Sequence, residues 1–218
     1  MSEKIISVLA GLLTAFSAFT AWADETCEVC DLRVLVSGQV SHGRAPEHLV
    51  ITGAARRMEE AFREEIRGKN FTLSIANLPA AEYTATIGLV EIAHTNTGGR
   101  VFNITCGDQA IATNLDIYDR AGGAGKVLYL TAHIEHPGDA LRGPLTLSFS
   151  GLTGEAKLNT FELRDEEAKQ PVVSLRAAYL ADAEDMASTA LPVVSDPEIW
   201  RDGSPPRSPG AGWPCCNC

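Results

Sequence analysis

The sequence is short of positive charge. Its 218 residues include 18 lysines and arginines against 28 aspartates and glutamates, so the formal net charge is −10 at pH 7, and the basic residues are scattered. Proteins that bind nucleic acid carry a basic stripe or patch, and attraction to anionic lipid needs a cluster of lysines and arginines. The composition therefore argues against both partners, and it suits a neutral ligand better than a phosphorylated one.

Sequence signatures of catalysis are also missing. The chain contains no G-x-S-x-G nucleophile elbow, no P-loop and no G-x-G-x-x-G dinucleotide fingerprint. His133, Glu135 and His136 are close in sequence, but on a strand His136 faces the side opposite to the other two, so they do not converge on a metal. We therefore expect a protein that is not an enzyme, with no cofactor and no metal site.

Only the N-terminus has a long hydrophobic run. Lys4 precedes an apolar run from Ile5 to Trp22, and Ala21-Trp22-Ala23 places small residues at the first and third positions before a cleavage site. The pattern predicts a signal peptide, residues 1–23, cleaved after Ala23. The alternative is a transmembrane anchor, because the run nearly spans a bilayer. We expect a secreted or periplasmic protein that does not contact the membrane after signal cleavage.

Export from the cytoplasm would permit disulfides, and the chain has six cysteines. Five lie in two clusters near the ends of the chain: Cys27, Cys30, Cys215, Cys216 and Cys218. They are candidates for disulfides between the two ends, disulfides to partners, or a four-thiolate zinc site. Redox catalysis is not favoured, because the segment after Cys30 reads as a strand. Cys106 shares one strand face with Phe102 and Ile104, so we expect it to be a buried core residue.

Most of the chain reads as short strands separated by turn residues. Its 45% apolar content is enough for one core, and Gly107-Asp108 separates two apolar segments as a tight hairpin turn. Strands at this spacing predict an all-β fold, either an antiparallel β-sandwich or a jelly roll. The expected strands are 32–40, 48–53, 70–78, 82–92, 100–106, 109–113, 126–136, 143–151 and 156–164.

One short helix is expected among these strands, from Ala55 to Gly68. Met58, Phe62 and Ile66 recur at helical spacing there, Glu59 and Arg63 can pair one turn apart, and Gly68 is a natural stop. The chain then divides into four parts: the signal peptide 1–23, a Cys-x-x-Cys extension 24–30, a sandwich domain 31–166, and a Pro/Gly/Ser-rich tail 167–218 that we expect to be disordered.

From residue 82 to 164 the sequence resembles a malectin domain. Five elements occur in the family's order: Tyr83 leading a strand that ends near Glu91, Val101-Phe102-Asn103, the Gly107-Asp108 turn, Asp116-Ile117-Tyr118 followed by Gly122-Gly123, and a last strand with Lys157-Leu158-Asn159-Thr160-Phe161. The resemblance implies a galactose-binding-like β-sandwich that binds glucose-containing or other oligosaccharides without catalysis.

The resemblance also implies where a sugar would bind. Malectin lectins carry an aromatic pair after the strand-ending glutamate and an aspartate before the last strand. Here Ile92-Ala93-His94 and Gly154-Glu155 stand at those places. We therefore expect a polar sugar site made of His94, Asn96, Tyr118 and Glu155. Tyr118 is either a ligand contact or a cover for the sandwich edge, and Asp116 either touches ligand or pins the Gly-rich loop.

Two functions remain open on the sequence alone. The first is a secreted, non-catalytic carbohydrate-binding protein that recognises an oligosaccharide or glycan and is accessory to glycan degradation. The second is a malectin-fold scaffold or interaction domain without sugar binding, linked to partners through its cysteine-rich ends. Residues 193–206 weakly resemble the lead-in to β-glucosidase-like glycoside hydrolases, which makes such a hydrolase a candidate partner.

Overall fold

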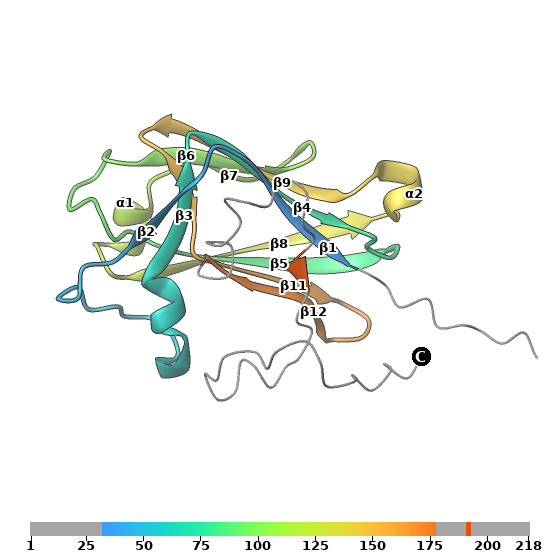
Figure 1. The fold of residues 1–218 in the computed structure, drawn as a ribbon, viewed down its shortest axis with the longest axis horizontal. Helices are drawn as coiled ribbons and strands as arrows, with labels where there is room; N and C mark the ends of the chain where they lie inside the picture. The colour runs from blue at the N-terminus through green and yellow to red at the C-terminus, as the bar shows by residue number, and fades with distance from the viewer. Residues whose placement is uncertain (1–31, 178–190, 193–218) are drawn as a thin grey trace, which may run out of the picture. The chain divides into compact units, whose positions relative to one another are not determined.

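The computed structural model of the chain describes residues 32–177 and 191–192 (Figure 1). The strands pair antiparallel in three sheets. The six-stranded sheet has the order β13 (Leu191–Pro192), β1 (Arg33–Gly38), β4 (Asn70–Ala76), β9 (Leu145–Thr153), β6 (Val101–Cys106) and β7 (Gln109–Leu115). The four-stranded sheet has the order β12 (Pro171–Arg176), β11 (Thr160–Asp165), β5 (Ala81–Val90) and β8 (Val127–His136). A three-stranded sheet contains β10 (Ala156–Leu158), β3 (Glu64–Gly68) and β2 (Ser41–Arg44).

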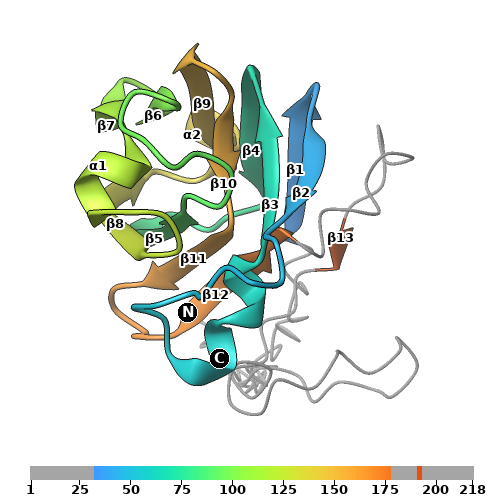
Figure 2. The same ribbon diagram turned by 90° about the vertical axis from the view of Figure 1, so that its left-hand side faces the viewer.

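Apolar alternation decides which strand faces are buried. Tyr83, Ala85, Ile87 and Leu89 of β5 are all buried, as the period of two predicts. Figure 2 shows β8, β5, β11 and β12 in one layer and β9, β4 and β1 in the other. The inward faces of the two layers form one hydrophobic cluster. The predicted antiparallel β-sandwich is therefore confirmed.

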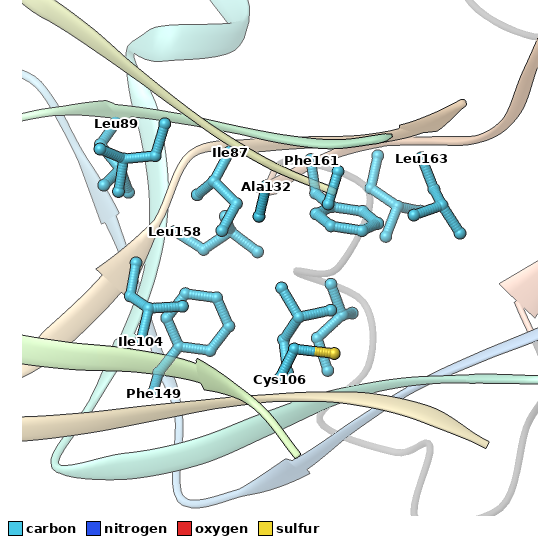
Figure 3. Packing of buried hydrophobic residues seen from close by; sticks show 14 of the residues in the cluster. Ile87, Leu89, Ile104, Cys106, Ala132, Phe149, Leu158, Phe161 and Leu163 are labelled. Carbon is cyan, nitrogen blue, oxygen red and sulfur yellow. The ribbon is translucent and has the colours of Figure 1, made fainter. Parts of the chain in front are cut away.

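Side chains from both layers meet in the core. In Figure 3, Ile87 and Phe161 of the four-stranded sheet lie across from Ile104, Cys106 and Phe149 of the six-stranded sheet. Cys106 is a buried free thiol, and burial raises its pKa. Its predicted role as a core residue is confirmed.

The predicted Gly107-Asp108 hairpin is also present. Cys106 at the end of β6 pairs with Gln109 at the start of β7, which leaves a two-residue turn. Gly107 has a φ of +54°, a left-handed conformation that glycine adopts without strain.

The helix predicted from Ala55 to Gly68 is wrong. Two short 3₁₀ turns, η1 (Arg56–Met58) and η2 (Glu60–Phe62), are followed by strand β3. Phe62 and Ile66 are buried as the helical spacing implied, but Ile66 lies on a strand between His42 and Leu158 of the neighbouring strands. Pairing on both sides of β3 thus overrides the local pattern. Arg63 pairs with Glu60, at 3.8 Å, rather than with Glu59.

Two other sequence boundaries differ. The strand expected at 48–53 is absent from the described chain, where only an isolated bridge joins Thr52 to Lys126. The sandwich also continues past residue 166, the expected end of the domain, because β12 pairs with β11 and buries Val173 and Leu175. A short apolar run after a polar turn supplies this edge strand.

Several sequence predictions lie outside the described residues. These are the signal peptide 1–23, the five terminal cysteines and most of the tail after Ala177. Within the described residues, no helix is both long enough and apolar enough to cross a membrane.

Candidate functional site

The loop between β5 and β6, Glu91–Arg100, carries two of the predicted site residues, His94 and Asn96. It begins with a turn that Glu91 holds in place. The Glu91 Oε1 atom accepts hydrogen bonds from the backbone amides of Ala93, at 2.9 Å, and His94, at 3.1 Å. Because the donors are backbone amides, these two bonds to Glu91 do not depend on which side chains Ala93 and His94 carry.

Arg100 closes the other end of the loop. It is only 3% exposed, and its Nε atom donates to Glu91 Oε2 at 2.9 Å. Its Nη1 atom donates to the carbonyl of Glu155 at 3.0 Å, in the turn between β9 and β10. The two ends of the loop are therefore joined by a buried ion pair and tied to a second loop.

Two more buried charges complete this arrangement. Lys157 of β10 is fully buried and donates to Glu65 of β3 and to the carbonyl of Val90. Glu65 Oε1 lies 3.7 Å from Arg100 Nη2. We call Glu65, Glu91, Arg100 and Lys157 the buried ion cluster. Its two carboxylates and two cations balance, which is the condition for burying charge at tolerable cost.

The cluster changes the acidity of its members. Burial acts to raise the pKa of Glu91, but the charges of Lys157 and Arg100, with the two backbone amides, outweigh it, and the net pKa is lowered. Burial lowers the pKa of Lys157, and the carboxylates of Glu65 and Glu91 only partly offset this effect. A lowered pKa keeps Glu91 ionised, so it is suited to holding structure and unsuited to donating a proton.

The first turn of α1 (Ile117–Ala121) supports the loop from the side. Asp116 caps this helix through Oδ1, which accepts from the Asp119 amide at 3.1 Å. Its other oxygen, Oδ2, accepts from the amide of Gly98 at 2.5 Å. Asp116 therefore acts as a pin, but it holds the β5–β6 loop at Gly98 rather than the Gly-rich loop after α1, and both of its oxygens bind backbone.

The loop end consists of the β5–β6 loop, α1 and the β9–β10 turn, and it contains all four predicted site residues. The ring of His94 lies against Gly99, where an added Cβ would be 2.9 Å from the ring. Asn96 is exposed and donates to the carbonyl of Thr97 at 3.0 Å. Glu155 is exposed, 3.4 Å from Arg67. Tyr118 is half-buried on α1.

The structure brings together the backbones that carry these residues rather than their side chains. A Cβ at Gly154 would lie 3.2 Å from the carbonyl of Gly99, so the loop of His94 and Asn96 touches the turn of Glu155. Within residues 32–177, no hydrogen bond or ion pair joins any two of the four predicted side chains. The loop end is therefore a polar surface whose segments are joined through their backbones.

Sequence reasoning missed the residues that hold this surface. The sequence places Glu65 in the expected helix and Arg100 at the start of an expected strand, and neither placement predicts a buried charge. Lys157 was matched to the family pattern without a role. One signal was available: Lys157 stands alone between apolar residues in a segment predicted to be a strand, and a lone charge of this kind needs a buried partner.

Comparison with known proteins agrees with this architecture. The structure is similar to the ANXUR1 extracellular domain from Arabidopsis thaliana, with 16% identity and a TM-score of 0.51 over 60% of this chain and 39% of that chain. It is also similar to the ANX1 ectodomain from Arabidopsis thaliana, with 14% identity and a TM-score of 0.53 over 60% and 40%. A third similar structure contains the plant peptide RALF23 in complex with FER and LLG2, with 15% identity and a TM-score of 0.51 over 60% and 40%. At these identities the likeness concerns the fold.

This chain aligns with only about 40% of the length of the solved structures that it resembles. No curated protein matches it. A family model described as Malectin domain matches residues 40–160, which is more than half of the chain. The chain therefore belongs to the malectin domain family.

Proposed function

We propose that this protein is a non-catalytic binding protein that acts outside the cytoplasm and holds an oligosaccharide at its loop end. One observation carries the proposal: the β5–β6 loop is fixed before any ligand arrives. Glu91 and Arg100 join its ends, and Asp116 holds Gly98 from the side. A preformed loop loses little conformational entropy on binding, which matters for a weak polar ligand such as a sugar.

The predicted site residues have the chemistry that sugar hydroxyls require. His94 and Asn96 can donate and accept hydrogen bonds, and the Glu155 carboxylate accepts them. Tyr118 offers part of an aromatic ring on the neighbouring helix. Among the described residues, the side chain of Asn96 bonds to the loop backbone and that of Glu155 pairs with a surface arginine, so a ligand can displace these contacts at small cost.

The state of the carboxylates at the loop end supports a role without catalysis. A general acid needs a raised pKa, whereas the pKa of Glu91 is lowered. Both carboxylate oxygens of Asp116 accept hydrogen bonds from backbone amides. Glu155 is exposed and pairs with Arg67 at 3.4 Å.

We also propose that the protein is exported from the cytoplasm. A signal peptide cleaved after Ala23 would place the protein in a secreted or periplasmic compartment, where the terminal cysteines could form disulfides. The similarity to extracellular receptor domains is consistent with that placement. A glycoside hydrolase partner, suggested by residues 193–206, belongs to the same proposal.

A second candidate function is an interaction domain that does not bind sugar. One similar structure is a complex with a peptide, and His94 packs on its own loop rather than facing outward with Asn96. In this alternative the fixed loop end would dock a protein or peptide, and the cysteine-rich ends would link the assembly.

A glycan-array screen followed by calorimetry with the bound glycan tests the proposal. We expect a neutral oligosaccharide to bind and the affinity to fall about tenfold in His94→Ala and Glu155→Ala, which corresponds to about 1.4 kcal/mol. His48→Ala and Glu47→Ala are matched controls, since both positions are exposed and belong to a different loop. A blank array from folded protein would favour the interaction domain.

A further inference from the structure

The outer face of the four-stranded sheet contains a hollow that is separate from the loop end. Its volume is about 220 Å³. The hollow is lined by residues of η1 and of strands β5, β8 and β11. Figure 2 shows the 3₁₀ turns close to β11 and β12, on one side of this sheet. Its walls include Arg57, Met58, Thr86, Tyr129, Thr160 and Glu162. None of these residues belongs to the loop end.

Strand register brings the polar wall residues together. Thr86 of β5 lies directly opposite Glu162 of β11, and Gly88 lies between Tyr129 of β8 and Thr160 of β11. Side chains opposite one another in an antiparallel sheet are about 4.5–5.5 Å apart at Cβ. The hydroxyl, carboxylate and phenol groups of neighbouring strands therefore line one small area of sheet.

Gly88 makes room for the aromatic part of the hollow. An added Cβ at Gly88 would lie 2.9 Å from the ring of Phe62, so that ring occupies the space above the glycine. The ring of Tyr129 meets Phe62 at a centroid distance of 5.8 Å and an interplanar angle of 86°. This edge contact fixes the orientation of Tyr129 without burying it.

Among the phenylalanines, tyrosines and tryptophans of the described chain, Tyr129 is the only one that is exposed, at 47%. Burial of the rest of the group raises its pKa, which keeps the phenol protonated as a hydrogen-bond donor. Glu162 is half-buried, and Arg164 holds its Oε1 atom at 2.9 Å. The hollow thus combines an oriented aromatic ring with hydroxyl and carboxylate groups.

We propose that this hollow is a subsite for one pyranose ring of a neutral oligosaccharide. A sugar ring has an apolar C–H face that packs on an aromatic ring, and hydroxyls that bind polar side chains. The walls carry one positive charge, on Arg57, and one negative charge, on Glu162. Because the two charges balance, the hollow favours neither an anionic nor a cationic ligand. The volume is below the ~300–1,000 Å³ of pockets for drug-sized ligands, so it fits one ring of a longer chain.

The subsite does not depend on the proposed function of the loop end. It supplies the accessible aromatic ring that the loop end lacks, since Tyr118 is half-buried on α1. The two proposals also name different residues, which allows one to fail while the other holds.

NMR titration of the full-length isotope-labelled chain tests the subsite. The probes are maltopentaose, cellopentaose and laminaripentaose. We expect at least one of them to shift the amides of Thr86, Tyr129 and Glu162. Shifts confined to residues 93–99, 118 and 155 would overturn the subsite and leave the loop-end proposal standing, and no shift with any probe would overturn both.

Two matched tyrosine substitutions locate the contact. We expect Tyr129→Ala to weaken binding about tenfold, whereas Tyr118→Ala leaves the shifts of the sheet face unchanged. Tyr129→Phe keeps the ring and should retain most of the affinity. Glu162→Gln, which removes a charge without removing bulk, provides a second variant if Tyr129→Ala alters the fold. Unchanged affinity in both Tyr129→Ala and Glu162→Gln would overturn the subsite.

Discussion

The loop end and the sheet-face hollow belong to one sandwich, but different interactions hold them. The loop end is irregular backbone, and the buried ion cluster joins its segments. The hollow lies on regular strands, where the register of β5, β8 and β11 positions each side chain. A surface built on a sheet needs no buried charge to stay in place. A surface built on loops needs such anchors, so its shape depends on residues that no ligand would touch.

The largest effect is expected from Lys157→Met, which tests whether buried charge holds the loop end. The change leaves two buried carboxylates with one buried cation, and losing one member of a buried ion pair costs about 3–5 kcal/mol. Urea-induced unfolding measures this loss of stability. Lys169→Met is the matched control, because Lys169 is exposed and its ion pair with Glu166 lies at the surface. A loss no larger than that of the control would mean that the cluster does not stabilise the fold.

Acid should destabilise the protein partly through Glu91. Its pKa is lowered in the folded chain, so the unfolded chain binds the proton more tightly. The stability that Glu91 contributes is complete above its unfolded pKa of ~4.3 and is lost as the pH falls through the folded value. We expect urea midpoints measured at decreasing pH to fall less steeply in Glu91→Gln than in the wild type. Glu47→Gln, at an exposed position, should keep the wild-type slope.

A smaller effect is expected at the helix cap. Asp116→Ala removes the cap of α1 and the bond to Gly98, and losing a cap costs about 1 kcal/mol. Hydrogen exchange should accelerate at the amides of Gly98 and Asp119, while the core strands keep their protection. Asp108→Ala, in the exposed hairpin turn, is the control. Equal exchange in the two variants would show that Asp116 does not hold the loop.

The smallest effect on stability is expected on the sheet face. Glu162→Gln changes a half-buried residue whose ion pair with Arg164 lies at the surface, so stability should remain within about 0.5 kcal/mol of the wild type. Thermal unfolding checks this expectation. A loss above about 1 kcal/mol would show that the hollow is part of the packing that stabilises the sandwich rather than a surface free to bind.

The regular part of the fold could be predicted because its signal is local. Phe71, Leu73 and Ile75 alternate with polar residues, and each is buried. The helix at Ala55–Gly68 was predicted wrongly because the strands that pair with β3 are very short, Ser41–Arg44 and Ala156–Leu158. Segments of this length give almost no periodic signal, and β10 is far from β3 in sequence.

The candidate site was predictable only in outline. The resemblance placed His94 and Asn96 on a loop and Glu155 on a nearby turn, and these backbones do meet. The ion cluster could not be predicted, since it joins three separate segments through Glu65, Arg100 and Lys157. The hollow depends on Gly88 and Phe62 meeting in space, which no spacing in the sequence reveals.

The way in which Glu91 holds its loop has a consequence for how ligand preference could diversify. Glu91 accepts hydrogen bonds from the amides of Ala93 and His94, and Asp116 accepts one from the amide of Gly98. Arg100 is buried beneath this surface. These anchors act through the backbone, so the side chains of residues 93–97 can vary without removing them, whereas Gly98, with a φ of +82°, favours glycine. Substitutions at these positions, natural or introduced by loop grafting, could change which ligand is bound without changing the sandwich beneath the loop.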